Sequence, residues 1–400
     1  MNMYCKRYII TVFTCFFFIF GYAVSATTSP KAVKVPDELN PGLVHILDLV
    51  SPPQNASPDM SMIGTILDFI TAEKAAPSLF YSEPISGVPS AYYEFDLQSD
   101  LEKILRYAYN PDIPSVVFSP SSIRLSHWSE VNGQKQPLPK LWEHLDNLTH
   151  PMMVTGIERI ENTPDLFSGA YFGYDLYRTL ILATYKGKRV FLSLSRQKNV
   201  SEVGKKGMVL GEDEEWNYLY SGKYGMNKAG LGWVRPYIYE SYSISAYVEM
   251  DEGRSLSRCG IFKWIRAGWA GINMVNRNHI YTGIERFATS FKQIVENPQL
   301  PNPNRLAGSL SKLSTIPTTT LKRLTQAQLD ELKIQYEEVR GVKGLLKDHA
   351  YVERLSRIEM ESMVAKEYIK NVLTNGKNDE LLIFLDNPED TPKGEAGPFK

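Results

Sequence analysis

Two long stretches of alternating residues constrain the fold of this 400-residue chain more than any other feature. The first spans residues 171–196 and contains the turn sequence Lys186-Gly187-Lys188. The second spans residues 237–265, with a polar, glycine-containing turn at 251–254. Alternation with a period of two, interrupted by a short turn, is typical of β-hairpins. We therefore expect an antiparallel sheet of six or more strands across residues 115–266.

A strongly amphipathic helix is predicted directly after these strands, over Met274 to Asn297. Its apolar stripe consists of Ile280, Ile284, Phe287, Ala288, Phe291, Ile294 and Val295. This spacing is helical, and Asn297-Pro298 provides a stop. Because a sheet face and a helical stripe each need an apolar partner, we expect the helix to pack on the sheet.

Shorter helices are predicted on both sides of this core. Residues 60–73 and 96–109 show helical spacing, with Asp59 or Ser61 as a cap for the first. Residues from about 325 to 340 and from about 345 to 373 predict a helical pair. The predicted fold class is therefore α+β: a central antiparallel β-sheet packed by an amphipathic helix, with short N-terminal helices and a C-terminal helical hairpin.

Composition shifts along the chain suggest a division into segments. We predict a signal peptide (1–26), a mainly helical or irregular N-terminal segment (27–114), a β-rich core with its covering helix (115–297), a linker (298–320), a helical hairpin (321–376) and a largely disordered tail (377–400). The linker assignment rests on its high content of Pro, Asn, Ser and Thr.

The N-terminal residues predict export. Lys6 and Arg7 precede an uncharged apolar run from Tyr8 to Tyr22, and Val24-Ser25-Ala26 follows it. This order of a basic, an apolar and a small-residue region is that of a cleavable signal peptide, with cleavage after Ala26. The alternative is an uncleaved N-terminal anchor.

The cysteine content indicates the cellular compartment, and the net charge limits the classes of binding partner. Only Cys259 lies beyond the predicted signal peptide, so no internal disulfide forms in the mature chain. An exported protein of this length without disulfides fits a bacterial periplasm better than a eukaryotic secretory route. The formal net charge of −1 gives no basic excess, which argues against a nucleic-acid partner.

The segment from Trp216 to Met250 is unusually aromatic and has two interpretations. It is either the interior of a sheet or a platform on which rings stack against an apolar or glycan ligand. Within its last strand, one face carries Tyr and Ser side chains and the other carries Ile, Ala and Val. The candidate ligand-binding residues are Trp216, Tyr218, Tyr220, Tyr224, Trp233, Tyr237, Tyr239 and Tyr242, beside the glycine-rich loop at 222–232.

No catalytic or metal-binding signature stands out in the sequence. The six histidines include no pair at i, i+4 and no H-E-x-x-H motif. Cys259 sits in an apolar strand sequence, which is typical of a buried small hydrophobe rather than a nucleophile. We therefore predict no catalytic residues, no metal and no cofactor, and we favour a non-catalytic protein over an enzyme.

Three classes of function remain open on this basis. The first is a binding or carrier protein of the bacterial cell envelope, with its ligand on the aromatic sheet face and glycine-rich loop. The second is a structural or interaction component of the envelope that binds a protein partner through residues 321–376. The third is a hydrolase acting on envelope material, which would require carboxylates, or Cys259 and a histidine, to converge in a cleft.

Overall fold

The computed structural model describes residues 32–74, 80–85, 87–228, 232–250, 255–336, 338, 351–374, 381 and 385. The predicted signal peptide, the hairpin turn at 251–254 and nearly all of the predicted tail lie outside these residues. Within the described part of the chain, no helix is both long enough and apolar enough to cross a bilayer.

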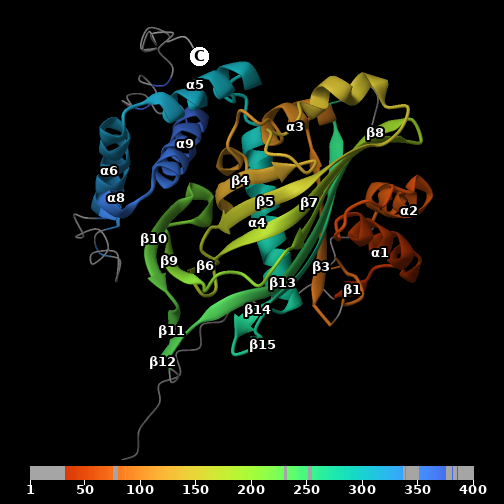
Figure 1. The fold of residues 1–400 in the computed structure, drawn as a ribbon, viewed down its shortest axis with the longest axis horizontal. Coiled ribbons are helices and arrows are strands. Elements are labelled where there is room, and N and C mark those ends of the chain that lie inside the picture. Colours follow the sequence, from red (N-terminus) through yellow and green to blue (C-terminus); the bar gives the residue numbers. More distant parts are fainter. Residues whose placement is uncertain are drawn as a thin grey trace, which may run out of the picture.

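A ten-stranded sheet forms the centre of the molecule (Figure 1). Its strands lie in the order β1 (Val33–Lys34), β2 (Phe80–Tyr81), β3 (Ser90–Leu97), β14 (Ser257–Trp269), β13 (Pro236–Glu249), β8 (Lys188–Gln197), β7 (Gly173–Tyr185), β5 (Met152–Asn162) and β4 (Ile123–Val131), and β15 (Ile272–Asn273) pairs with β14. Neighbouring strands are antiparallel except for the β1–β2 pair. The α+β prediction with a central antiparallel sheet is therefore confirmed.

Both predicted hairpins are present. In the first, Tyr185 of β7 pairs with Lys188 of β8, and Lys186 and Gly187 have φ angles of 50° and 79°. Two successive positive φ angles define the turn type that matches strand twist, and glycine adopts the second at little cost. The second hairpin joins β13 and β14.

The sequence interpretation missed a strand and extended a helix. Residues 96–109 were expected to be helical, but β3 continues to Leu97 and pairs with β14. The helix α3 (Leu101–Ala108) begins only after Asp100, whose side chain accepts a 2.7 Å hydrogen bond from the backbone N–H of Lys103. The capping aspartate sets this boundary.

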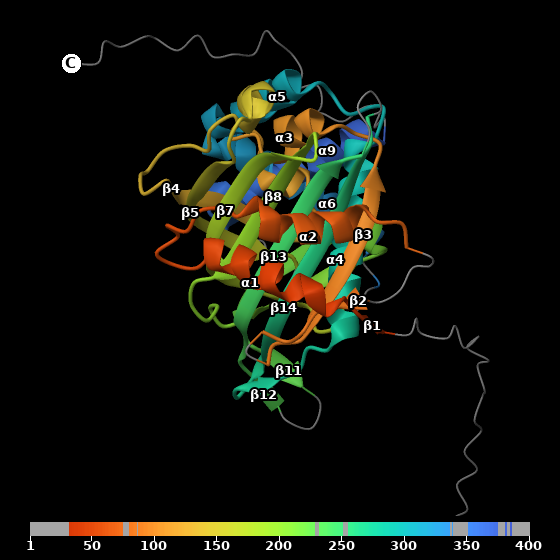
Figure 2. The ribbon, with the colours of Figure 1, turned by 90° about the vertical axis from the view of Figure 1, so that its right-hand side faces the viewer.

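Two N-terminal helices cover one face of the sheet (Figure 2). They are α1 (Asn40–Leu49) and α2 (Met60–Thr71), and Asp59 caps α2 as predicted. Ile63 and Ile66 of α2 belong to the same fully buried cluster as Ile244 and Phe262 of the sheet. This face is therefore an ordinary close-packed core.

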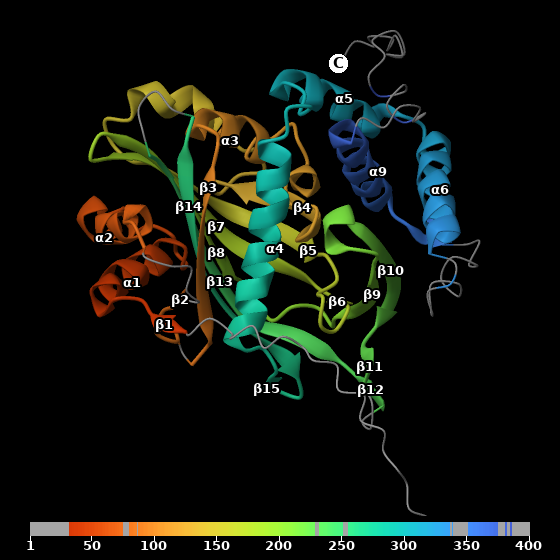
Figure 3. The same cartoon turned by 180° about the vertical axis from the view of Figure 1, so that it is seen from behind.

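The predicted amphipathic helix crosses the opposite face as α4 (Arg277–Val295) (Figure 3). Asn276 caps it, since its side chain accepts a hydrogen bond from the backbone N–H of His279. The contacts of α4 with the sheet are made mainly with β3 and β14, near one edge. Toward the inner strands, Phe291 of α4 contacts Tyr247 of β13, with ring centres 6.2 Å apart, so the helix covers these strands only in part.

Smaller sheets and helices complete the fold. β10 (Asn217–Tyr224), β9 (Lys205–Leu210) and β6 (Ala170–Tyr171) form a three-stranded sheet, and β11 (Met226–Lys228) pairs with β12 (Gly232–Val234). The C-terminal helices are α5 (Pro303–Thr315), α6 (Thr318–Gln335), α8 (Tyr351–Arg354) and α9 (Arg357–Leu373). Contacts between α6 and α9 form the predicted C-terminal hairpin.

Two details of this C-terminal region differ from expectation. Residues 298–320, expected as a linker, contain α5, whose Leu306, Leu310 and Leu313 are buried. Three leucines at helical spacing, with Asn302 as a cap and a following proline, outweigh the polar composition. The helix expected from about residue 345 is interrupted before Arg357, where Ser356 and Glu359 form a capping box that starts α9.

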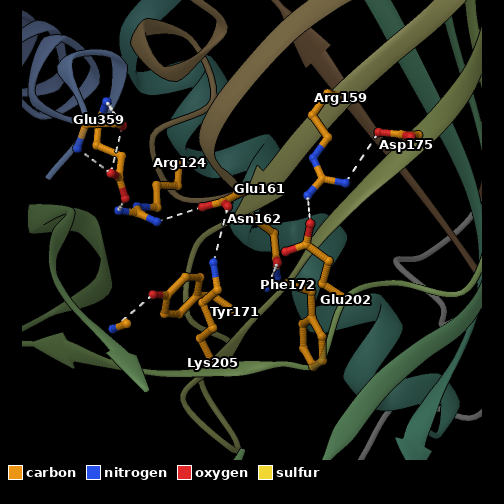
Figure 4. A network of polar contacts seen from close by, with 12 residues as sticks. Arg124, Arg159, Glu161, Asn162, Tyr171, Phe172, Asp175, Glu202, Lys205 and Glu359 are labelled. Atoms are coloured by element: carbon orange, nitrogen blue, oxygen red, sulfur yellow. Dashed lines mark hydrogen bonds and ion pairs between the residues drawn. The ribbon is translucent and has the colours of Figure 1, made fainter. Parts of the chain in front are cut away.

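A buried arginine fixes α9 to the sheet (Figure 4). Arg124 of β4 forms ion pairs with Glu161 of β5 and with Glu359 of α9. Its guanidinium also lies 4.2 Å from the ring centre of Tyr220. Since removing one partner would leave a buried charge uncompensated, this network ties the C-terminal hairpin to the core.

Candidate ligand-binding cavity

A cavity of about 1390 Å³ is lined by the inner strands of the sheet and by α4. This volume exceeds the roughly 300–1,000 Å³ typical of small-molecule sites. The sheet wall comes from β4, β5, β7, β8, β13 and β14, and the facing wall includes Ile280, Ile284, Phe287 and Phe291 of α4. Part of the predicted helical stripe therefore faces an internal space rather than the sheet.

Small side chains at the centre of the sheet create this space. Ser193 and Ser195 of β8 pair with Ser245 and Ser243 of β13, and all four serines line the cavity. On the packed face, the intervening positions are larger or fully apolar, such as Leu194 and Ile244. Four serines leave a gap where leucine-sized side chains would otherwise meet α4.

One buried ion pair lies in this wall. The guanidinium of Arg178 on β7 binds Glu158 on β5, with its Nε 2.8 Å from the Oε2 of Glu158. It also donates a 3.2 Å hydrogen bond to the hydroxyl of Ser193. Ser126 donates to the other oxygen of the Glu158 carboxylate. The charges of Arg178 and Glu158 are thus compensated within the protein.

A second cation lines the cavity without such compensation. Lys263 of β14 is half-buried, and no hydrogen bond or ion pair joins its ammonium group to any residue that the structure describes. Burial, and to a lesser extent the nearby Arg178 guanidinium, lowers the pKa of Lys263 to about 8. Lys263 therefore differs from Arg178 and Glu158, the other charged residues of the central strands in this wall, whose charges neutralise each other.

The cavity reaches the surface beside the start of α4. Leu166, Phe167 and Met274 line the cavity and are also exposed to solvent, Phe167 by 61%. The ring of Phe167 lies 4.2 Å, centre to centre, from that of His279 on α4. This apolar rim offers a route by which an apolar molecule could enter.

The eight sequence-predicted aromatic residues do not line this cavity. Trp216, Tyr218 and Tyr220 are buried, and Trp216 donates a 3.2 Å hydrogen bond to Ser290 of α4. The hydroxyl of Tyr218 lies 2.9 Å from Asp213 and accepts from Arg286. These three side chains hold β10 against its neighbours.

The remaining predicted aromatics lie elsewhere. Tyr224 and Trp233 are 59% and 55% exposed. Tyr237 and Tyr239 stack on each other, with ring centres 6.3 Å apart. Tyr242 packs against the cluster beneath α1 and α2 and lies near Arg196. The structure therefore does not bring the eight residues together at one site.

A β-bulge explains why Tyr237 and Tyr239 lie away from the cavity. In the β13–β14 register, Ile238 pairs with Ala267 and Glu240 with Arg266, so Tyr239 is an extra residue. The extra residue inverts the alternation. Ile238 lines the cavity before the bulge, whereas Ser243, Ser245 and Tyr247 line it afterwards. The serine part of the predicted Tyr/Ser face thus faces the cavity.

Sequence reasoning missed the polar residues of the cavity. Glu158 and Lys263 were not singled out, and Arg178 was considered only as an ion-pair partner of Asp175, which instead pairs with Arg159. Cys259 is fully buried, and burial raises the pKa of its thiol. Within the described residues, no group of three or more His, Cys, Asp or Glu side chains is arranged to hold a metal ion.

Comparison with known proteins adds little to this geometry. No family model matches the sequence, and no curated protein matches it. Among solved structures, the chain is similar to the human StarD13 (DLC2) lipid transfer and protein localization domain, with 12% identity and a TM-score of 0.29. The alignment covers 59% of this chain and 98% of that domain. Similarity at this level does not establish a shared fold.

Proposed function

We propose that the protein is a non-catalytic carrier that encloses one apolar or amphiphilic small molecule between its main sheet and α4. The observation that supports this most directly is the large cavity with mainly apolar walls. Cavities of this kind bury most of a ligand's surface, and a few polar groups fix its orientation. The cavity favours an apolar ligand over a glycan, which would need many more polar partners.

Export belongs to the same proposal and is supported only by the N-terminal sequence. A basic, an apolar and a small-residue region suit a carrier that works in a bacterial envelope. Binding of a partner protein through residues 321–376 is not included, because Arg124 and Glu359 already dock α9 on the core. Hydrolysis is not included either, because among the described residues no hydrogen bond joins a serine of the sheet wall to a histidine, although His127 of β4 also lines the cavity.

Saturable binding of a neutral apolar dye such as Nile red tests the proposal. We expect one dye molecule per protein, with fluorescence enhanced by the mainly apolar walls of the cavity. Ser245→Trp places an indole on the sheet wall of the cavity and should abolish binding, whereas Ser245→Ala removes only a hydroxyl and should not.

A matched variant on the other side of the bulge completes this test. Tyr237→Ala/Tyr239→Ala removes the stacked pair that does not line the cavity, so dye binding should be unchanged. The proposal fails if folded protein shows no saturable binding. It also fails if the tyrosine variant loses the dye while Ser245→Trp keeps it.

A further inference from the structure

Four residues form a polar row across the cavity wall. Arg178 of β7 pairs with Ser195 of β8, Ser195 pairs with Ser243 of β13, and Ser243 pairs with Lys263 of β14. Directly paired residues of antiparallel strands project on the same face. All four line the cavity. The row therefore presents a cation at each end and two hydroxyls between them.

Most of the hydrogen-bonding capacity of this row is unused. Arg178 is occupied by Glu158 and Ser193. No hydrogen bond joins the hydroxyls of Ser195 and Ser243 to any other residue within the described part of the chain. Neither these hydroxyls nor the Lys263 ammonium group is among the buried atoms that lack a partner, so each can be reached from the cavity by water or by a polar group of a ligand.

The charged residues of the sheet wall indicate whether the polar group of the ligand is an anion or a cation. The central strands contribute two cations, Arg178 and Lys263, and one carboxylate, Glu158, which is already bound by Arg178. The other carboxylates lining the cavity are Asp112, Asp165 and Glu361, which lie in connecting segments or on α9, and none forms an ion pair with Lys263 among the described residues. A positive charge without an ion-pair partner among the described residues, in a cavity with mainly apolar walls, favours an anionic ligand group.

We propose that the ligand is an amphiphile with a single anionic headgroup, bound by Lys263, Ser195 and Ser243 inside the cavity. This inference rests on the proposed carrier function. The headgroup accepts hydrogen bonds from the Lys263 ammonium group and from the two hydroxyls. A carboxylate and a phosphate monoester share this chemistry, since both offer several negatively charged acceptor oxygens.

The apolar walls give the position of the chain. From Lys263, the cavity side of β14 continues through Ile265, Ala267 and Trp269 toward the rim that contains Phe167 and Met274. The six residue-to-residue steps from Lys263 to Trp269 span roughly 20 Å of strand. The chain therefore lies along this wall, with the headgroup inside and the tail toward the opening.

Four ligands with the same sixteen-carbon chain test the headgroup directly. Hexadecanoate, hexadecyl phosphate, hexadecanol and hexadecyltrimethylammonium are titrated into the whole protein below their micelle concentrations, with binding followed by calorimetry. We expect the two anions to bind about 10- to 100-fold more tightly than the alcohol, and the cation to bind most weakly. The ratio between the two anions identifies which headgroup the site prefers.

Substitutions of Lys263, Ser195 and Ser243 test whether these residues cause the preference for an anionic headgroup. Lys263→Met should reduce hexadecanoate affinity to that of hexadecanol, and Lys263→Arg should retain most of the anion preference. Ser195→Ala/Ser243→Ala should weaken anion binding and leave the alcohol unchanged. Lys206→Met is the matched control, because Lys206 is an exposed lysine of β9 that does not line the cavity.

The outcomes separate this inference from the carrier function. If all four ligands fail to bind folded protein, the carrier function fails and the inference fails with it. If hexadecanol or the quaternary ammonium binds as well as the acid, or if Lys263→Met keeps the anion preference, the carrier function stands and the anionic headgroup is wrong.

Discussion

The two faces of the main sheet use the same strands but are filled differently. Toward α1 and α2, Ile244 and Ala246 of β13 are completely buried among large apolar side chains. Toward α4, the neighbouring positions are Ser243 and Ser245, and α4 contacts the sheet mainly near its edge. One face is therefore a close-packed core, and the other encloses a cavity.

This difference shows how a sheet can serve stability and binding at once. Close packing on one face supplies apolar burial without interference from function. The face toward α4 buries less apolar surface because it carries serines, and its Lys263 has no ion-pair partner in the described part of the chain. This arrangement lowers stability and leaves space for a ligand. Substitutions on the two faces should accordingly have different effects.

The largest expected difference comes from a matched pair of isoleucines. Ile244→Ala on the packed face should lower the free energy of unfolding by about 3–4 kcal/mol, because it opens a void in a dense core. Ile265→Ala on the cavity face should cost about 1 kcal/mol, because its side chain is only half-buried and already borders a space. Urea unfolding measures both values, and equal losses would contradict the contrast between the faces.

Removing the cavity lysine should stabilise the protein at neutral pH. The pKa of Lys263 lies at about 8, below its ordinary value of 10.5, so the folded state holds this charge unfavourably below pH 8. Lys263→Met should raise the free energy of unfolding by about 1–3 kcal/mol at pH 7. A lower stability of this variant would indicate that the ammonium group has a structural partner.

The pH dependence of the Lys263→Met effect has a definite sign. Between pH 8 and 10.5 the unfolded chain binds more protons at Lys263 than the folded one, so wild-type stability gains relative to the variant as the pH rises. The advantage of Lys263→Met should therefore be largest below pH 8 and vanish above about pH 10.5. Thermal unfolding across this range measures it, and a constant difference would argue against a lowered pKa.

The smallest expected effects come from exchanging Ser and Ala between the faces. Ala246→Ser places a hydroxyl in the packed face and should cost about 1 kcal/mol or more. Ser245→Ala on the cavity face should change the unfolding free energy by less than about 0.5 kcal/mol. Thermal unfolding of both variants tests this, and a larger loss for Ser245→Ala would mean that its hydroxyl has a structural role.

Local patterns were enough to predict much of the fold. Alternation and the Lys186-Gly187 turn predict the first hairpin, and the stripe that includes Ile284 and Phe291 predicts α4. These signals depend on residues near one another in the sequence. Strand β3 was missed because its pairing with β14 joins residues more than 150 positions apart, and no local signal reports such a contact.

The candidate site was less predictable for two physical reasons. Ser195 and Ser243 become neighbours only through the β8–β13 pairing, which their separate hairpins do not specify. The bulge at Tyr239 reverses the alternation, so a strict period of two assigns Tyr237 and Tyr239 to the wrong side of β13 relative to Ser243. Aromatic content therefore drew attention to residues that hold strands together, whereas small polar residues line the cavity.

The position of a bound amphiphile tests the central claim most directly. Crystals of the protein grown with 16-bromohexadecanoic acid would locate the chain end through the anomalous signal of bromine. We predict a bromine peak inside the cavity toward Trp269 and Met274, with the carboxylate beside Lys263. A ligand located on the stacked Tyr237 and Tyr239 instead, with the cavity filled only by water, would contradict the account.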